Sequence, residues 1–353
     1  MPTKLSRRDF VRLCAGSAAA ISLSGFLVPF IKEAAAAGGP PVIWIQGGSC
    51  TGCSISILNT VHPDIEKVIT EVIGLHYHPN LSAGAGSLVI DEMYRVAAEN
   101  SKKFYLVVEG AVPVADDGAY CIIGERNGHH LTFVQAVKEL GSQAAGILNF
   151  GTCSAYGGFP ATPPNPTECK PVKEIVKNVP IVNVPGCPPH PDWMVGTIAH
   201  VVLYNELPEL DAFGRPTMFF DKIIHDNCQR RQYFDNAIFA KNFGEPGCML
   251  ELGCKGPFAH CDSTTRLWNG GTNWCVKAGG VCIGCTEPQF PAWPIYERLP
   301  EMPVAPGITA TVDQIGGVLA AAAVVGIGGH LAGNIYTGRI GSKKNQDMKE
   351  GDE

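Results

Sequence analysis

Charged side chains are scarce in this chain. They make up 17% of its 353 residues, whereas soluble globular proteins usually have about 25%. The net charge is −6, and the sequence has no basic patch with interleaved aromatic residues, so nucleic acid is excluded as an expected partner. A low charged fraction instead indicates large apolar surfaces that are covered by a partner protein or by a membrane.

The N-terminus has the layout of an export signal. Residues 6–11, Ser-Arg-Arg-Asp-Phe-Val, resemble the twin-arginine consensus, and an apolar stretch follows over residues 13–31. Small residues suitable for cleavage occupy Ala34 to Ala37, so residues 1–37 are predicted to be a twin-arginine signal peptide. This route carries folded proteins, so cysteines that bind metal in the cytosol are not free to form disulfides after export.

A second apolar stretch lies near the C-terminus. Residues Ile315 to Ile335 carry no formal charge and are long enough to span a bilayer. The basic flank after this stretch is expected to stay in the cytoplasm, which places the body of the protein on the periplasmic side of the cytoplasmic membrane. The predicted segments are a linker, a transmembrane helix and a cytoplasmic tail: residues 301–311, 312–336 and 337–353.

Buried strands alternate with helical patterns over residues 38–205. This alternation predicts an α/β fold with a doubly wound parallel sheet, whose ligands bind beyond the carboxyl ends of the strands. The apolar runs that predict strands are residues 42–45, 106–108, 145–149 and 181–184.

Cysteines follow three of these predicted strands. Cys50 and Cys53 lie in "QGGSCTGC", Cys153 lies in "GTCSAYGG", and Cys187 lies in "PGCPPHP". Because the carboxyl ends of parallel strands share one edge, we expect all four thiols to converge. Four convergent thiolates suit a tetrahedral metal or a cubane iron–sulfur cluster.

Two other interpretations of these cysteines stay open. Cys50 and Cys53 could form a thioredoxin-type redox pair in an exported thiol–disulfide oxidoreductase, although this leaves Cys153 and Cys187 without a role. A zinc-stabilised interaction module is the other alternative, but zinc sites usually combine two close C-x-x-C knuckles. The dispersed spacing favours a cluster.

Regular periodicity fades after residue 206, and seven cysteines fall between Cys228 and Cys285. A segment this rich in loops, here residues 206–300, is expected to need cofactors to fold. Its candidate ligands form two groups: His225, Cys228, Cys248 and Cys254, and then Cys261, Cys275, Cys282 and Cys285. The first group, with three thiolates and one imidazole, also matches a Cys3His zinc site.

Six motifs in this order resemble the small subunit of membrane-bound, uptake-type [NiFe] hydrogenases. They are "CTGC", "GTCSAYGG", "PGCPPHP", "HDNCQRRQYFD", "LGCKGP" and "CIGCTEP". The resemblance implies a flavodoxin-like N-terminal domain, a C-terminal cluster domain and a wire of three iron–sulfur clusters. It also implies that the nickel–iron centre lies in a separate large subunit, and that a membrane cytochrome b or another quinone-linked subunit takes the electrons.

The same resemblance assigns the ligands and no catalytic residue. It implies a proximal [4Fe-4S] cluster on Cys50, Cys53, Cys153 and Cys187, and a distal [4Fe-4S] cluster on His225, Cys228, Cys248 and Cys254. It implies a medial cluster on Cys261, Cys282 and Cys285. Many relatives have proline in place of Cys275, which leaves a [3Fe-4S] cluster; with Cys275 as a fourth ligand, we favour [4Fe-4S] here.

Five other residues receive weaker expectations. Cys14 lies in the signal, Cys121 is expected to be a buried thiol, and Cys169 is expected to be a surface thiol. Glu109 is expected to be a solvated loop carboxylate, with a role toward protons or the partner as the alternative. His330 lies within the apolar C-terminal stretch, where an ionisable group is costly, and contact with a haem-bearing partner or helix packing would explain it.

Overall fold

The computed structural model describes residues 6–10, 39–61, 63–297, 302–305, 308–310 and 312–340. The chain divides into two compact units, residues 1–297 and 298–353. Most of the predicted signal peptide and the end of the predicted tail lie outside the described residues.

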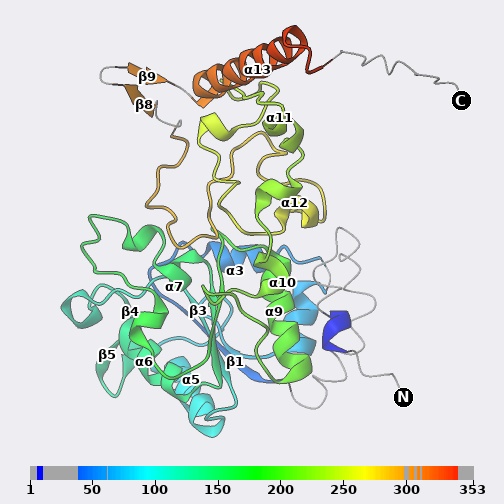
Figure 1. Ribbon diagram of the computed structural model, residues 1–353. Helices are drawn as coiled ribbons and strands as arrows, with labels where there is room; N and C mark the ends of the chain where they lie inside the picture. The colour runs from blue at the N-terminus through cyan, green and yellow to red at the C-terminus, as the bar shows by residue number, and fades with distance from the viewer. Residues whose placement is uncertain are drawn as a thin grey trace, which may run out of the picture. The chain divides into compact units, whose positions relative to one another are not determined.

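A five-stranded parallel sheet forms the centre of the first unit (Figure 1). Its strands are β1 (Pro41–Gln46), β2 (Gly74–Tyr77), β3 (Tyr105–Glu109), β6 (Gly146–Phe150) and β7 (Ile181–Val184). They are arranged in the order β2-β1-β3-β6-β7, and every neighbouring pair is parallel. This is the flavodoxin-like order, so the predicted doubly wound fold is confirmed.

Helices cover both faces of the sheet because alternate strand residues point to opposite sides. In β1, Ile43 and Ile45 belong to the apolar core that includes residues of α5 (Ser87–Glu99) and α6 (Phe133–Gln143). Val42 and Trp44 belong to the other core, which includes residues of α9 (Pro191–Tyr204). The sheet is therefore buried on both faces.

Shorter elements fill the connections of this domain. They are α3 (Gly52–Ile57), α4 (Ile65–Lys67), the π-helical η2 (Val68–Val72), the 3-10 turns η3 (Ala115–Gly118) and η4 (Phe159–Ala161), the antiparallel hairpin β4 (Ile122–Arg126) and β5 (His129–Thr132), α7 (Thr152–Tyr156) and α8 (Val172–Ile175). Helices α3 and α7 begin six and two residues after the last residues of β1 and β6, so both lie at the edge where ligands bind in such folds.

The second part of this unit consists mostly of loops, as the sequence predicts. Its regular elements are α10 (Thr217–Phe220), η5 (Ile224–Asn227), α11 (Arg231–Asp235), η6 (Leu250–Leu252) and α12 (Ser263–Arg266). The apolar core of the α9 face continues into it through Met249, Trp274, Val276 and Val281. The loops therefore share a core with the sheet domain.

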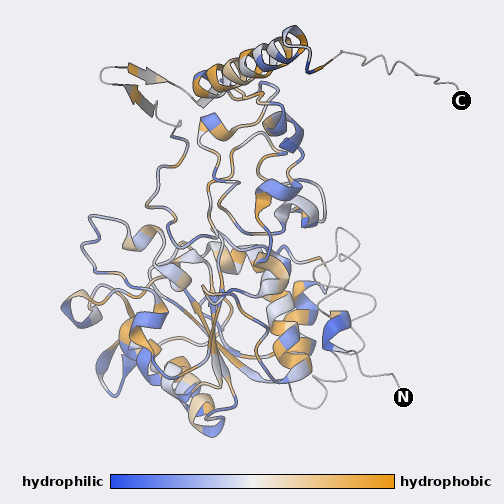
Figure 2. Cartoon of the chain, viewed as in Figure 1, coloured by the Kyte–Doolittle hydropathy of each residue, from blue (hydrophilic) through white to orange (hydrophobic). Residues whose placement is uncertain are grey.

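The C-terminal unit contains a hairpin and one long helix. Strands β8 (Met302–Ala305) and β9 (Ile308–Ala310) pair antiparallel, and α13 covers Val312–Tyr336. Residues Gln314–Tyr336 are long and apolar enough to cross a membrane, with a mean hydropathy of 1.8. Figure 2 shows hydrophobic residues along this helix, and Val324 and Val325 are 71% and 73% exposed. The predicted candidate span is therefore present as a helix.

Candidate metal centres

The first cysteine group lies beyond the carboxyl ends of β1, β6 and β7. Cys53 sits in the first turn of α3, and the structure brings Cys50, Cys153 and Cys187 close to it. Burial raises the pKa of the Cys53 thiol well above its ordinary value, and Glu109 and the other three thiols add to this shift. The loops after three separate strands thus bring the four thiols to one place.

Two glycines leave space for these sulfurs. A Cβ atom at Gly151 would lie 2.5 Å from the sulfur of Cys53, and one at Gly158 would lie 2.8 Å from the sulfur of Cys153. Both glycines also have positive φ, +95° and +53°, which disfavours other residues. Any side chain at either position would push a thiol out of the group.

Glu109 is not the solvated loop carboxylate that we expected. It is the last residue of β3 and is fully buried, with 0% exposure. The main-chain N–H of Cys53 donates a hydrogen bond to its Oε1 at 3.1 Å. The parallel register pairs it with Gln46, so Glu109 lies beside the loop that carries the first two cysteines. Sequence periodicity carries no signal for this, because the charge of a strand-end residue does not reveal what covers it.

The second group lines a cavity whose walls include His225, Cys228, Cys248 and Cys254. Burial raises the pKa values of Cys228 and Cys248, and Cys254 lies close enough to raise both further. Three thiols and an imidazole from 30 residues of chain therefore line one cavity.

The His225 side chain has the features of a metal ligand. Its Nε2 atom is buried and has no hydrogen-bond partner within the part of the chain that the structure describes. Burial lowers its pKa, and the nearby positive charge of Arg231 lowers it further. A neutral imidazole is the form that binds metals. An orphaned nitrogen in a thiol-lined cavity fits a metal cluster.

The third group contains the predicted medial ligands. Burial raises the pKa of Cys261 to about 12 and also raises those of Cys282 and Cys285 well above the ordinary value. Cys275 is exposed, yet it is close enough to Cys261 and Cys285 to contribute to the raised pKa values of both. The structure thus places Cys275 with this group.

The first and third groups are in direct contact. The hydroxyl of Thr152 donates to the main-chain carbonyl of Cys285 and accepts the N–H of Gly186 at 2.9 Å. Burial raises the pKa of the Cys285 thiol, whereas a hydrogen bond from the main-chain N–H of Cys187 lowers this pKa. A ligand of the first group therefore lies against a ligand of the third.

The third group also contacts the second. Burial raises the pKa of Cys282, and the largest contribution from another thiol comes from Cys254. The N–H of Lys255 donates to the carbonyl of Cys282 at 2.7 Å. The three groups therefore follow one another in space in the order first, third, second.

A buried ion pair joins the segment between α9 and α10 to the loop that follows Cys285 of the third group. Arg215 is 2% exposed and donates to Glu287 Oε1 at 2.9 Å and to the carbonyl of Thr286 at 3.2 Å. Glu287 also accepts the N–H of His260 at 2.6 Å. Sequence reasoning missed Arg215, since nothing in the local sequence distinguishes it from a surface arginine.

The donor sets suit iron–sulfur clusters, which bind thiolates and, at some sites, an imidazole. Among the described residues, no three His, Cys, Asp or Glu side chains lie close enough together to hold one metal ion.

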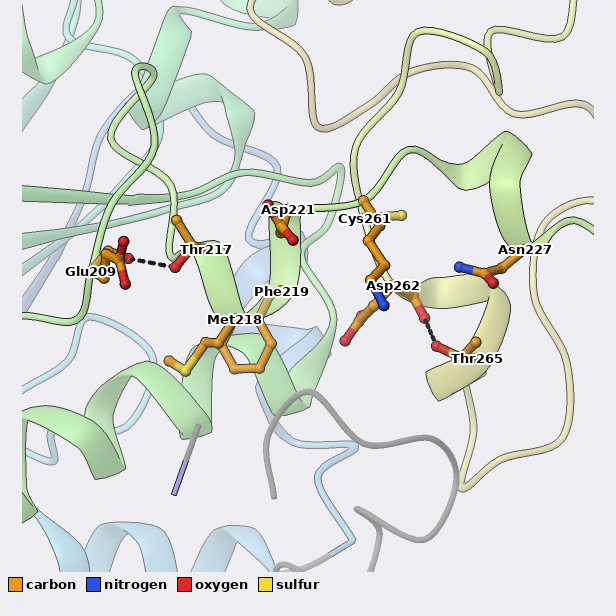
Figure 3. A pocket seen from close by; sticks show the side chains of 10 residues that line it. Glu209, Thr217, Met218, Phe219, Asp221, Asn227, Cys261, Asp262 and Thr265 are labelled. Carbon is orange, nitrogen blue, oxygen red and sulfur yellow. Dashed lines mark hydrogen bonds between the residues drawn. The ribbon is translucent and has the colours of Figure 1, made fainter. Parts of the chain in front are cut away.

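A separate pocket of about 430 Å³ lies near Cys261 (Figure 3). Its lining includes Asp221, Asp262 and Thr265, and the hydroxyl of Thr265 donates to the carbonyl of Asp262 at 3.1 Å. Figure 3 shows the Cys261 sulfur pointing away from Asp221. The pocket therefore shares Cys261 with the third group, whereas its other lining residues lie outside the three cysteine groups.

Two thiols outside the groups differ from expectation. Cys169, predicted at the surface, is buried with 5% exposure, and Cys121, predicted to be buried, is half-buried. Cys169 packs against Gly48, whose added Cβ would lie 3.5 Å from its sulfur. The burial of both thiols depends on packing between segments that are distant in the sequence.

Comparison with known families identifies both parts of the first unit. Residues 220–296 match the family described as the C-terminal part of the NiFe/NiFeSe hydrogenase small subunit. Residues 50–201 match the family described as NADH ubiquinone oxidoreductase, 20 Kd subunit.

Individual relatives cover most of the chain. It is 47% identical to the periplasmic [NiFeSe] hydrogenase small subunit of Desulfomicrobium baculatum over 81% of this chain and 96% of that relative. It is 36% identical to the quinone-reactive Ni/Fe-hydrogenase small chain of Wolinella succinogenes over 92% of this chain and 95% of that relative. The solved structure of a reduced, active form of the Desulfomicrobium baculatum NiFeSe hydrogenase matches with a TM-score of 0.71 and 46% identity, covering 74% of this chain and 100% of that one.

Members of this family carry iron–sulfur clusters, transfer electrons and pair with a large subunit to form a heterodimeric hydrogenase. The parallel sheet, the three groups of thiols and the relatives that match most of the chain all indicate the same family. The chain belongs to the family of NiFe hydrogenase small subunits.

Proposed function

We propose that this chain carries the electrons of H2 oxidation from the large subunit through three iron–sulfur clusters to a membrane electron carrier. The observation that carries this proposal is the spatial order of the three cysteine groups. Thr152 and Cys187 connect the first group to Cys285 of the third, and Cys254 of the second group lies beside Cys282 of the third. This order matches a proximal, medial and distal wire.

The clusters are assigned by donor set. Four thiols suit a proximal [4Fe-4S] cluster, and three thiols with His225 suit a distal [4Fe-4S] cluster. For the medial site we favour [4Fe-4S] over [3Fe-4S], because Cys275 lies near Cys261 and Cys285. Each bound cluster supplies a one-electron redox centre, and the H–H bond is broken in the large subunit.

The protein's own residues hold, bury and tune these centres. Burial raises the pKa values of Cys53, Cys153 and Cys187 in the first group, so each of these thiols would lose its proton as iron binds. The imidazole of His225 makes its ligand set less anionic than four thiolates, which raises the reduction potential of that cluster. A higher reduction potential at the distal cluster favours electron transfer from the medial cluster to the distal one.

The location follows from the two ends of the chain. We infer that residues 1–37 direct twin-arginine export and that α13 anchors the protein, with the clusters on the periplasmic side and residues 337–353 in the cytoplasm. The domain assignment is residues 38–205 for the proximal domain, 206–300 for the medial and distal domain, 301–311 for the linker and 312–336 for the membrane helix. The Wolinella succinogenes relative is a quinone-reactive hydrogenase small chain, which supports a cytochrome b or another quinone-linked subunit as the membrane partner.

Isolation of the protein with its natural partner tests the proposal. The purified complex is expected to be brown, to contain nickel and iron, and to reduce a dye when H2 is supplied. A colourless complex with zinc in the cysteine groups would support an interaction module, and reversible dithiol chemistry at Cys50 and Cys53 without iron would support a thiol–disulfide oxidoreductase.

A further inference from the structure

Glu109 lies at the centre of a buried hydrogen-bond network next to the first cysteine group. Its Oε1 accepts the main-chain N–H groups of Cys53 and Ser54 at 3.1 and 3.3 Å. Its Oε2 accepts the indole N–H of Trp44 at 3.2 Å and the amide of Gln46 at 2.9 Å. The Ser54 hydroxyl contacts the same Oε2 at 2.5 Å. One carboxyl group therefore takes part in five hydrogen bonds.

The direction of the hydrogen bond between Ser54 and Glu109 follows from the groups around the Ser54 hydroxyl. The main-chain N–H of Asn80 donates to His78 Nδ1 at 3.1 Å, so the ring proton of neutral His78 is on Nε2. Burial lowers the pKa of His78, although Glu109 opposes the shift, which keeps the ring neutral. His78 Nε2 at 3.1 Å and Gln46 Nε2 at 2.8 Å both donate to the Ser54 oxygen. The Ser54 proton therefore points to Glu109.

Glu109 thus accepts five hydrogen bonds and donates none, which is the pattern of an ionised carboxylate. Within the described part of the chain, no lysine or arginine forms an ion pair with it. Among the described residues, the groups that donate hydrogen bonds to this carboxylate are neutral dipoles, and its field acts on the nearby thiols. After burial, Glu109 makes the largest contribution to the raised pKa of Cys53.

We propose that Glu109 is a positioning residue of the first cysteine group and lowers the reduction potential of the cluster bound there. This inference rests on the proposed function. The carboxylate fixes the Cys53 and Ser54 N–H groups, so neither is free to donate to a cluster sulfur, and such bonds affect cluster potentials. Its negative charge, in a buried site of low dielectric, also disfavours the arrival of an electron. Both effects lower the reduction potential of the cluster.

The test is a redox titration of the proximal cluster in the intact heterodimer, followed by electron paramagnetic resonance. Glu109→Gln keeps an acceptor for the two N–H groups and removes the charge, so the midpoint potential is expected to shift to more positive values. Gln46→Met removes a neutral donor and leaves the carboxylate less screened, so the potential is expected to shift to more negative values. Glu139→Gln, on the surface of α6, serves as the matched control and is expected to leave the potential unchanged.

The two variants make the test decisive. An unshifted potential in Glu109→Gln with the cluster retained would overturn the inference, as would an unshifted or positively shifted potential in Gln46→Met. Where Glu109→Gln fails to assemble, the direction of the Gln46→Met shift decides. A wild-type heterodimer without iron in this group would instead refute the proposed function itself, and the inference with it.

Discussion

Thr152 donates its hydroxyl proton to the main-chain carbonyl of Cys285, although 133 positions separate them. Thr152 is 1% exposed and lies between Gly151 and Cys153. The bond joins the ligand loop of β6 to the loop that carries the last cysteine. It therefore joins the loops of the first and third groups directly.

Replacing Thr152 with valine keeps the shape of the side chain and removes this bond. Leaving a buried carbonyl unsatisfied costs about 1–3 kcal/mol, so the third group is expected to lose iron faster on mild heating. The rate of loss of visible absorption measures this, and Thr152→Ser is expected to restore stability. Thr265→Val, which removes an exposed hydroxyl that bonds locally, is the control; equal rates for the two valine variants would contradict the account.

Arg215→Met breaks the buried pair with Glu287. Breaking a buried pair leaves an uncompensated charge and costs about 3–5 kcal/mol. The thermal transition of the intact complex is therefore expected to fall clearly. The matched variant is Arg126→Met, whose pair with Glu139 is 37% and 46% exposed and is worth about 0–1 kcal/mol. Similar shifts for the two variants would show that the Arg215 pair does not hold the loop of the third group.

Cys275→Pro tests the type of the medial cluster. With Cys275 as the fourth ligand, the oxidised wild-type protein is expected to lack the resonance near g of about 2.01 that is typical of three-iron clusters. The proline variant is expected to show it. Cys121→Ala changes a half-buried thiol outside the three groups and should not produce the signal. A strong three-iron signal in unaltered protein would refute the fourth ligand.

Protease treatment of intact spheroplasts tests the orientation in the membrane. With the body outside and the basic tail inside, digestion is expected to remove residues of the first unit and to spare α13 and the tail. The same protease in detergent should remove the tail as well, which provides the control. Full protection of the body in intact spheroplasts would reverse the orientation.

The sheet and the first cysteine group could be predicted because local signals agree with the fold. The apolar run at residues 181–184 forms β7 with the expected boundaries. The run at residues 42–45 forms β1, which is one residue longer at each end. Cysteines after parallel strands must share an edge, so their meeting follows from the topology. Strand β2 was missed because its sequence, Gly-Leu-His-Tyr, is short and lacks a clear apolar pattern.

The environment of buried polar residues could not be predicted in the same way. Glu109 and Arg215 look like surface residues in the sequence, and their burial depends on partners 55 to 72 positions away. The contact between Thr152 and Cys285 also depends on how the loops pack on the sheet. Composition and periodicity describe one segment at a time, so they carry no information about such pairs.

The central claim, electron transfer through three clusters, is tested most directly by adding H2 to the oxidised, oxygen-free heterodimer. With three four-iron clusters the small subunit is expected to contain about twelve iron atoms, and its broad visible absorption should bleach under H2 and return when an oxidised dye is added. A spectrum that dithionite bleaches but H2 leaves unchanged, in a complex that contains nickel, would contradict the account.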